Sequence, residues 1–560
     1  MKNIKNSLIA AVGSILILSC NKTIDKLQAD PNNPTKVLPN LVVGSILTDM
    51  SGTVSNASAS GAGSGSPIGA LGGVASWDAV HRWNQYYCSN YNYYNTNTYF
   101  WQNGPFDGYL VLKNVVQMEN EALNSGYAAL NPFEAMGRFI RAYYYYNMTS
   151  MMGDIPQGAD LKAFDNSTPA YTPQKQVFKY ILNTLDTANT EFANLIAAGD
   201  KSLSPTQDIY FNGDLTKWQK LVNSFKLRVL ISLSLQSADA DLDIAGQFVK
   251  IYGDHGPLGK YPIFEDPADD FKFVYQPTYN LYYFSPANYG SIAGRYNMAQ
   301  TYVQALTTLK DPRVYVTSEP AWAFVDKAAG GLDTTGNGLA ATDFNAFAGS
   351  STGESITQMY AEAPTGIYSF INRKRYFDTY VGEPDVLVGY KEMCFNIAEA
   401  ANRGWITAAD AETWYKNGIT ESFKFYGIDP AQTSFTATFQ KPTQTKVGSY
   451  TTYPFTFDFT AYYNGASVKY TAGATGLNQI ILQKYIAMFQ NSGWEAYFNY
   501  RRTGVPAFQS GTGIGNNGVI PKRWAYPVNE QSVNGANWKA ALANQQFATD
   551  DLNGTMWLLK

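Results

Sequence analysis

The sequence predicts a mostly α-helical protein whose helices pack in pairs, with long loops that project from one face and a few short β-strands. Apolar residues recur at helical spacing in several separate segments, and Asn, Asp, Thr and Pro mark where these segments start. Stretches rich in Gly, Asn and aromatic residues interrupt them. Recurring helix pairs favour helix-turn-helix repeats stacked as a solenoid, although the chain has no clean 34-residue period.

The first forty residues are typical of an exported lipoprotein. A short basic head precedes an apolar run, Leu8–Leu18, which is too short to span a bilayer. Cys20 follows a small residue at the point where the chain turns polar. We therefore predict a signal peptide over residues 1–19, acyl chains on Cys20 and a tether over residues 20–40. The alternative is an ordinary secretory signal with an accidental cysteine.

The remainder, residues 41–560, is predicted to be a single domain because no low-complexity linker divides it. The 41 basic and 45 acidic residues give a net charge of -4, and no basic block is present, so nucleic-acid binding is not expected. Charged and aromatic residues each make up 15%, with 41 Tyr and 11 Trp. This balance favours a surface that meets neutral polar ligands. No further run is long and apolar enough to span a membrane.

Cysteine and histidine usage argues against several kinds of site. Apart from Cys20, the chain has only Cys88 and Cys394, which allow at most one disulfide. His81 and His255 are the only histidines, so a zinc cluster or a His-dependent catalytic triad is not expected. We predict no metal and no cofactor, a packing role for His81, and a buried position for Cys394.

Local patterns place the elements along the chain. Helices are predicted over 41–50, 131–151, 172–195, 215–229, 392–401, 408–425, 477–499 and 529–543. Surface loops are predicted over 51–73 and 329–353, an irregular aromatic region over 253–322, and short strands or an insertion over 433–470.

The segment 77–101 is the aromatic peak of the chain, and Asn and Gln are interleaved with its rings. It has almost no Leu, Ile or Val, unlike a core helix. Sugars have apolar C–H faces and polar edges, so a glycan site needs flat rings beside amides and hydroxyls. The alternative, that the rings build the core or a partner-facing surface, stays open for each residue. The predicted ligand-binding residues are Trp77, Trp83, Asn84, Trp101, Tyr279, Tyr283, Tyr289 and Trp322.

Motifs that resemble catalytic or nucleotide sites have simpler explanations. Gly513, Gly515 and Gly518 match GxGxxG, but no strand precedes them and no helix follows, so a loop is expected. The acidic cluster around Pro267 fits no calcium loop and reads as a turn. Glu399 is expected to pair with a buried arginine in the scaffold. No catalytic site is predicted.

Five segments, in order, resemble the SusD/RagB family and its SusD-like nutrient-binding lipoproteins. Each segment alone is a weak match, but together they span most of the chain. They are Phe139-Ile-Arg-Ala-Tyr143 with Gly153-Asp-Ile-Pro156; Lys310-Asp-Pro-Arg-Val314; 392–405; Gln483-Lys-Tyr-Ile-Ala487 with Arg501-Arg-Thr-Gly504 and Pro506; and Arg523-Trp-Ala-Tyr-Pro527 with Glu530 and Asn534.

The resemblance implies a monomeric protein with a scaffold of tetratricopeptide-like helix pairs, lipid-anchored to the outer membrane and facing the cell exterior. It also implies a TonB-dependent SusC-like transporter as partner, to which a captured nutrient oligomer, most simply an oligosaccharide, is delivered without catalysis. Two alternatives stay open: a peptide-binding relative, and an anchored glycoside hydrolase. A charged ligand would need Arg or Asp beside the aromatic loops, and Arg82, Arg295 and Asp78 are the candidates.

Overall fold

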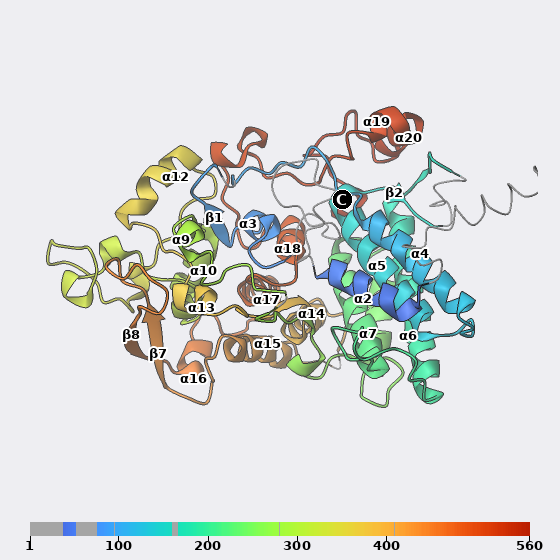
Figure 1. The fold of residues 1–560 in the computed structure, drawn as a ribbon, viewed down its shortest axis with the longest axis horizontal. Coiled ribbons are helices and arrows are strands. Elements are labelled where there is room, and N and C mark those ends of the chain that lie inside the picture. Colours follow the sequence, from blue (N-terminus) through green and yellow to red (C-terminus); the bar gives the residue numbers. More distant parts are fainter. Residues whose placement is uncertain (1–36, 52–74, 94–95, 159–165, 279, 408) are drawn as a thin grey trace, which may run out of the picture.

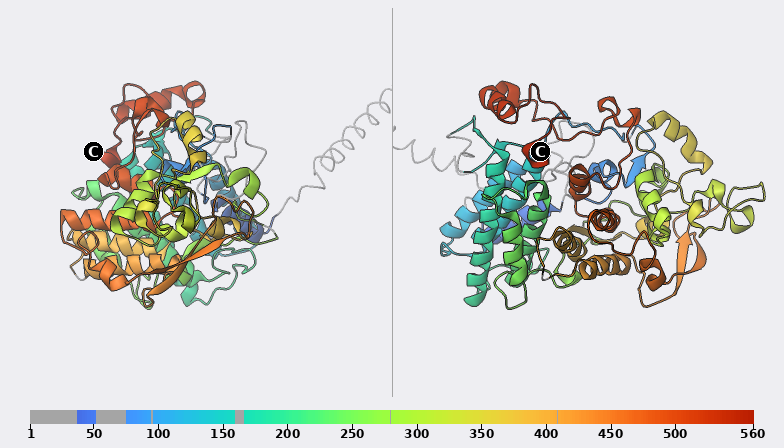
Figure 2. Two further views of the ribbon diagram at one scale, coloured as in Figure 1. Left: turned by 90° about the vertical axis from the view of Figure 1, so that its left-hand side faces the viewer. Right: turned by 180° about the vertical axis from the view of Figure 1, so that it is seen from behind.

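The computed structural model describes residues 37–51, 75–93, 96–158, 166–278, 280–407 and 409–560 (Figure 1). One end of the molecule is a block of long helices, in which consecutive members of the series α4 to α7 lie side by side (Figures 1 and 2). The block contains α2 (Pro39–Met50), α4 (Gly108–Asn124), α5 (Pro132–Met152), α6 (Gln174–Ala197) and α7 (Leu215–Ser232). It forms the scaffold of the fold.

Local chemistry fixes where several of these helices begin. The Asn131 side chain accepts a hydrogen bond from the Glu134 amide at 3.0 Å, and Pro132 fills the first turn, where no backbone donor is needed. Asp214 caps α7 in the same way, accepting from the Thr216 amide at 2.9 Å. These caps satisfy amides that have no partner within the helix.

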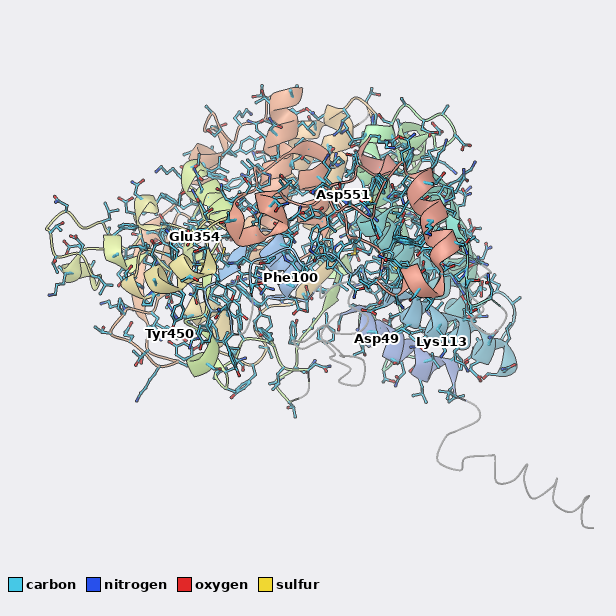
Figure 3. The ribbon with its side chains drawn as sticks, turned by 90° about the horizontal axis from the view of Figure 1, so that it is seen from above. Asp49, Phe100, Lys113, Glu354, Tyr450 and Asp551 are labelled. Carbon is cyan, nitrogen blue, oxygen red and sulfur yellow. The ribbon has the colours of Figure 1, made fainter. Side chains whose placement is uncertain are left out.

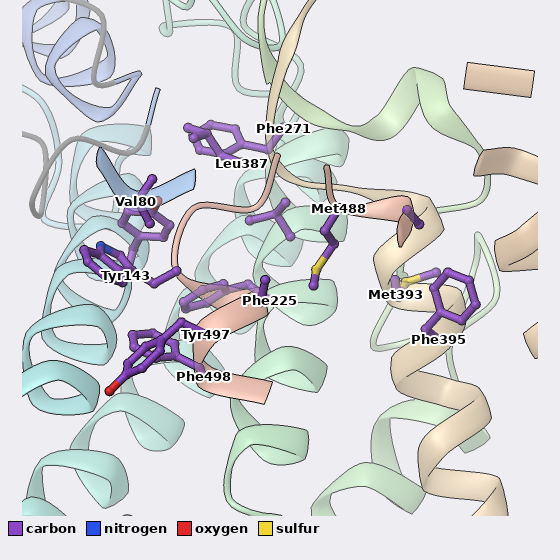
Figure 4. Close-up of a cluster of buried hydrophobic side chains, with 14 of the residues drawn as sticks. Val80, Tyr143, Phe225, Phe271, Leu387, Met393, Phe395, Met488, Tyr497 and Phe498 are labelled. Atoms are coloured by element: carbon purple, nitrogen blue, oxygen red, sulfur yellow. The ribbon is translucent and has the colours of Figure 1, made fainter. Parts of the chain in front are cut away.

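A second group of helices fills the middle of the molecule: α14 (Tyr390–Asn402), α15 (Ala411–Phe425), α17 (Ala474–Ala487) and α18 (Glu495–Thr503) (Figure 1). The core joins this group to the block, as Figure 4 shows. There Tyr143 of α5 lies 5.6 Å from Phe225 of α7, between ring centroids, and Tyr497 and Phe498 of α18 lie beside them. Close ring contacts of this kind stabilise beyond the area they bury.

Short elements complete the fold; most lie at the irregular far end, whereas the sheet formed by residues 155–156 and 171–172 lies beside the helical block (Figure 1). Within the described residues, four antiparallel two-stranded sheets form: β1 (Tyr87–Ser89) with β5 (Tyr296–Met298), β2 (Ile155–Pro156) with β3 (Tyr171–Thr172), β4 (Phe271–Phe273) with β6 (Asp385–Val388), and β7 (Ser434–Phe439) with β8 (Thr451–Thr456). The other α-helices are α3 (Ala79–Trp83), α8 (Ile244–Gly253), α9 (Tyr289–Ile292), α10 (Gln300–Leu309), α11 (Val314–Thr317), α12 (Ile356–Glu362), α13 (Arg373–Phe377), α16 (Phe459–Tyr463), α19 (Glu530–Val533) and α20 (Gly535–Asn544).

Buried ion pairs tie the helices together. Arg228 of α7 donates from Nε to Glu392 of α14 at 2.8 Å. Arg502 of α18 binds Glu399 of α14 through both terminal nitrogens, and both side chains are almost fully buried. The predicted scaffold role of Glu399 is confirmed. Removing one member of such a pair leaves an uncompensated charge in the core, so each pair fixes how two helices sit.

Most predicted helices are confirmed, including those expected at 41–50, 131–151, 215–229, 392–401 and 408–425. The helix expected to start at Thr172-Pro173 begins at Gln174, and Pro173 occupies its cap position. The predicted helix over 477–499 is wrong as one element, because positive backbone φ angles at Gln490, Ser492 and Gly493 separate α17 from α18. The sequence analysis also did not predict helices α4, α8 and α10.

Three further findings concern the part of the chain that the structure describes. Cys88 and Cys394 are both buried and free. No group of three or more His, Cys, Asp or Glu residues there is arranged to hold a metal ion. Among the described helices, none has the length and hydropathy needed to cross a membrane. The expected signal peptide, Cys20 and the glycine-rich loop after Ser51 lie outside the described residues.

Candidate ligand-binding surface

The β1–β5 sheet ends in a loop, residues 90–97, that carries several tyrosines. The Asn90 amide donates to the Arg295 carbonyl at 3.0 Å, which continues the ladder beyond the strands. Asn97 closes the loop: its Oδ1 accepts from the Ser89 amide at 2.9 Å, and its Nδ2 donates to the Ser89 carbonyl at 3.0 Å. The Asn97 amide therefore bonds to the backbone of β1 as a neighbouring strand would.

Tyr91, Tyr93 and Tyr360 form a cluster of solvent-facing rings, which we call the tyrosine platform. The Tyr91 ring centroid lies 6.2 Å from that of Tyr93 and 5.4 Å from that of Tyr360. Tyr93 is 79% exposed and Tyr360 is 50% exposed. The guanidinium carbon of Arg295 lies 3.8 Å from the Tyr91 centroid, a cation–π contact. Two distant parts of the chain thus meet in one aromatic surface.

Buried contacts beneath the tyrosine platform hold its loop and α12 together. Tyr360 belongs to α12, whose amino end is capped by Ser355 through the Gln358 amide at 3.2 Å. The preceding residue, Met359, is fully buried in a small cluster with Cys88 of β1. The Asn97 amide lies 3.8 Å from the Met359 sulfur, so the loop and α12 are joined beneath the exposed rings.

Exposed rings on a fixed base suit a ligand that has flat apolar faces and polar edges. Tyrosine gives a large contact area at low entropic cost and adds a hydroxyl at the ring edge. Asn92, between two of the rings, is exposed and supplies an amide. Two hollows among the described residues lie elsewhere, beside Asp49 and beside His255.

A second aromatic position lies across the same sheet. Tyr283 is 47% exposed, and its surroundings include Tyr296 of β5, Asp78 and Arg82. Burial raises the pKa of Tyr283, so its hydroxyl stays protonated and remains a donor. Burial also raises the pKa of Asp78 to about 7, although the nearby Arg82 guanidinium opposes the rise.

Four of the residues expected to contact ligand lie instead in the core. Trp101 has no exposed surface, and its ring stacks on Trp524 with centroids 5.0 Å apart. Trp83 is buried and donates from its indole to the Thr98 carbonyl at 3.0 Å. Trp77 donates to the Tyr282 hydroxyl at 2.6 Å, and the Asn84 amide donates to the Gly493 carbonyl at 2.8 Å. These side chains present no face to a ligand, so we do not carry them into the proposed site.

The other four residues that we expected to contact ligand differ in their exposure to solvent. Tyr283 is exposed, as a ligand contact requires. Tyr289 is half-buried, and its hydroxyl donates to the Gln440 side chain. Trp322 is buried, with its ring 6.5 Å from that of Phe439. Tyr279 lies outside the described residues.

The sequence analysis included Tyr91 and Tyr93 only within the aromatic segment 77–101, and it predicted no ligand contact for Tyr360. The stretch around Tyr91 and Tyr93 is Asn-rich and has no aliphatic residue, which is the signature of an exposed loop. Trp77 and Trp83 flank the aliphatic Val80, a sign of the core. No comparable signal marks Tyr360, because it is a single ring in a short helix.

Comparisons with known proteins place this helical fold in one class, the SusD-like proteins. A family model described as "Starch-binding associating with outer membrane" matches residues 74–527, and the chain belongs to this SusD-like family. A SusD homologue from Bacteroides fragilis has a TM-score of 0.72 and 24% identity over 94% of this chain and 100% of its own. An outer-membrane protein from Bacteroides vulgatus, for which a role in nutrient binding has been suggested, has a TM-score of 0.72 and 26% identity over the same shares.

A chitin-binding SusD homologue from Flavobacterium johnsoniae is more distant, with a TM-score of 0.64 and 20% identity over 93% of this chain and 98% of its own. It shares the fold. No curated protein matches the chain.

Proposed function

We propose that this protein is a lipid-anchored outer-membrane lipoprotein that binds a nutrient oligosaccharide at the tyrosine platform and delivers it to a TonB-dependent SusC-like transporter. The observation that carries the proposal is the platform itself, with Tyr93 and Tyr360 exposed on a base fixed by Asn97 and Met359. Membership of a starch-binding, outer-membrane family supports it, as does the chitin-binding relative.

The proposed activity is binding without hydrolysis. A glycoside hydrolase needs two carboxyl groups placed across the scissile bond. Among the described residues, the carboxylates bordering α12 are Glu354 and Glu362, and both accept from the Tyr368 hydroxyl, Glu354 at 2.8 Å. The Tyr368 hydroxyl, with its single hydrogen, lies between these two carboxylates, where a catalytic pair would need the scissile bond.

Calorimetry on the soluble form, residues 21–560, tests the proposal. The titrants are oligosaccharides of cellulose, chitin, starch and pectin, together with a mixed oligopeptide pool. We expect saturable binding to one glycan, weakened at least tenfold by Tyr360→Ala or Tyr93→Ala. Tyr380→Ala, which removes an exposed tyrosine outside the platform, is the matched control and should leave affinity unchanged. Binding confined to peptides would move the protein to the peptide-import alternative.

Attachment and delivery have separate tests. Replacing the expected lipid site, Cys20→Ala, should move the protein from the membrane fraction to the soluble fraction. Intact lipoprotein purified from outer membranes should bring a TonB-dependent barrel with it. Failure of the second experiment would overturn delivery while leaving glycan binding in place.

A further inference from the structure

The hollow beside His255, which we call the His255 hollow, combines aromatic walls with a carboxylate. Its volume is about 190 Å³, and its lining includes the rings of His255, Phe264, Tyr390 and Trp414 together with the side chain of Glu265. A water molecule takes up about 30 Å³, so the hollow has room for roughly six waters or for one side chain of similar size. Aromatic rings beside a carboxylate are a composition suited to a cation.

Contacts between helices hold the walls of the His255 hollow in place. Tyr252, near the end of α8, stacks on His255 with ring centroids 4.6 Å apart. The Tyr252 hydroxyl also accepts a hydrogen bond from the Trp414 indole of α15 at 3.1 Å. The Phe264 amide donates to the Ser224 hydroxyl of α7 at 3.0 Å. Three helices therefore fix the rings before any ligand arrives.

The free polar side-chain atoms of the His255 hollow are acceptors. The Tyr252 carbonyl can only accept, so the His255 Nδ1 atom bonded to it carries the hydrogen. In the neutral imidazole, Nε2 is then an acceptor, and it has no partner among the described residues. Glu265 binds Lys220 through Oε2, and its Oε1 has no partner in the described part of the chain.

The side-chain donors in the same lining are already engaged. The Trp414 indole donates to Tyr252, and the Tyr390 hydroxyl donates to the Cys394 sulfur. A sugar carries hydroxyl groups around its whole ring and needs donors as well as acceptors, so several hydroxyls would lose their hydrogen bonds here. An ammonium group needs acceptors only, and an alkyl stem suits the apolar walls.

The charges next to the hollow leave room for an outside cation. Glu265 and Asp269 share the ammonium of Lys220, which lies 2.8 Å from Asp269, so two carboxylates face one cation. Lys217 and Lys272 donate to backbone carbonyls of the turn that follows Glu265. The Glu265 side chain is 46% exposed, and its unbonded oxygen is therefore accessible to a ligand.

We propose that the His255 hollow binds a primary alkylammonium, such as a lysine side chain, whose nitrogen donates to Glu265 and His255 while its stem lies against the Trp414 ring. The four methylenes and the nitrogen of lysine match a space of roughly six waters. Leu258, in the loop after His255, is fully exposed and offers an apolar contact to a residue beside the lysine in a peptide. This site is separate from the tyrosine platform and goes beyond the proposed function.

Peptides that differ only at the end of one side chain test the proposal. Fluorescence anisotropy on residues 21–560 compares a dye-labelled Gly-Ser-Lys-Ser-Gly peptide with versions that carry norleucine or Nζ-acetyl-lysine in place of lysine. Norleucine keeps most of the stem without the ammonium, and acetyl-lysine keeps the length without the charge. We expect both to bind at least tenfold more weakly.

Butylamine, which has the stem and ammonium of lysine alone, distinguishes the two sources of the group. We expect it to displace the lysine peptide. A peptide that binds more tightly than butylamine identifies a lysine within a chain as the ligand, whereas equal affinity identifies a free amine.

Variants assign the binding to the His255 hollow. Glu265→Gln removes the charge and keeps the shape of the side chain, and Trp414→Ala removes a ring; each should weaken binding of the lysine peptide at least tenfold. Asp49→Asn, in the other hollow, is the matched control and should have no effect. Asp49 and Lys113 lie on the adjoining helices α2 and α4, at the end of the molecule away from Glu354 (Figure 3).

The comparison of lysine with norleucine on the unaltered protein decides the matter even if a variant does not fold, which circular dichroism would show. Equal affinity for the two peptides, or no binding of any amine at millimolar concentration, would overturn the proposal. Binding of a neutral sugar that is lost in Trp414→Ala would also overturn it. Glycan binding at the tyrosine platform is tested separately by Tyr360→Ala, which should leave binding of the lysine peptide unchanged.

Discussion

Replacing Arg502 with Met tests whether buried ion pairs hold the helices in register. Burial by itself raises the pKa of Glu399, but the charges of Arg502, Arg403 and Lys484 outweigh it and lower the value from 4.5 to about 2. A fall of this size in a fully buried group corresponds to about 3 kcal/mol of stability. Because the folded-state pKa is the lower one, this contribution is complete above pH 4.5 and is lost as the pH falls toward 2.

In Arg502→Met, Glu399 keeps only Arg403, a more exposed partner at 2.8 Å, and the more distant Lys484. We expect the free energy of unfolding at pH 7 to fall by about 3–5 kcal/mol. The deficit should narrow below pH 4.5, because a protonated Glu399 no longer needs a cation. Urea unfolding at pH values from 3 to 8 measures both effects, and the double variant Arg502→Met with Glu399→Met should recover most of the loss. A deficit below 1 kcal/mol, or one independent of pH, would refute the reasoning.

Three further predictions follow from other contacts. Trp101→Ala should cost about 3–5 kcal/mol in urea unfolding, because it empties a fully buried ring site, and the folded fraction should bind ligand normally. Asn131→Ala should cost about 1 kcal/mol by losing the α5 cap, whereas Asn131→Asp should be nearly neutral; thermal melts measure both. Asn97→Ala should leave the core intact but expose residues 90–97 to limited proteolysis and weaken ligand binding, whereas unchanged cleavage would show that the Ser89 contacts do not hold the loop.

Features set by neighbouring residues were predictable from the sequence. The start of α5 depends on Asn131 and Pro132, which act within one turn, and Asp410 caps α15 in the same local way through the Glu412 amide at 3.2 Å. The break between α17 and α18 also has a local cause, since Gln490-Asn491-Ser492-Gly493 is a turn sequence, and Gly493 adopts a positive φ at no steric cost. Because apolar residues keep helical spacing on both sides of this turn, the sequence pattern predicted one continuous helix.

The burial of the tryptophans was not predictable from their surroundings. Trp83 and Trp101 pack against Trp494 and Trp524, which lie about four hundred residues further along the chain. A run of aromatics among amides has the composition of a sugar site whether or not distant rings cover it. The exposed part of the same run, Tyr91 and Tyr93, lies where the chain leaves β1, and only tertiary structure distinguishes the two parts.

The clamp between Asn97 and Ser89 has a consequence for how such proteins diversify. The clamp holds the loop through the backbone of β1 and through the Met359 sulfur at 3.8 Å, and neither contact involves the exposed side chains of Asn92 and Tyr93. These two side chains can therefore change without loss of the scaffold. We expect substitutions at Asn92 and Tyr93 to change what the surface binds while the backbone of β1 keeps its position.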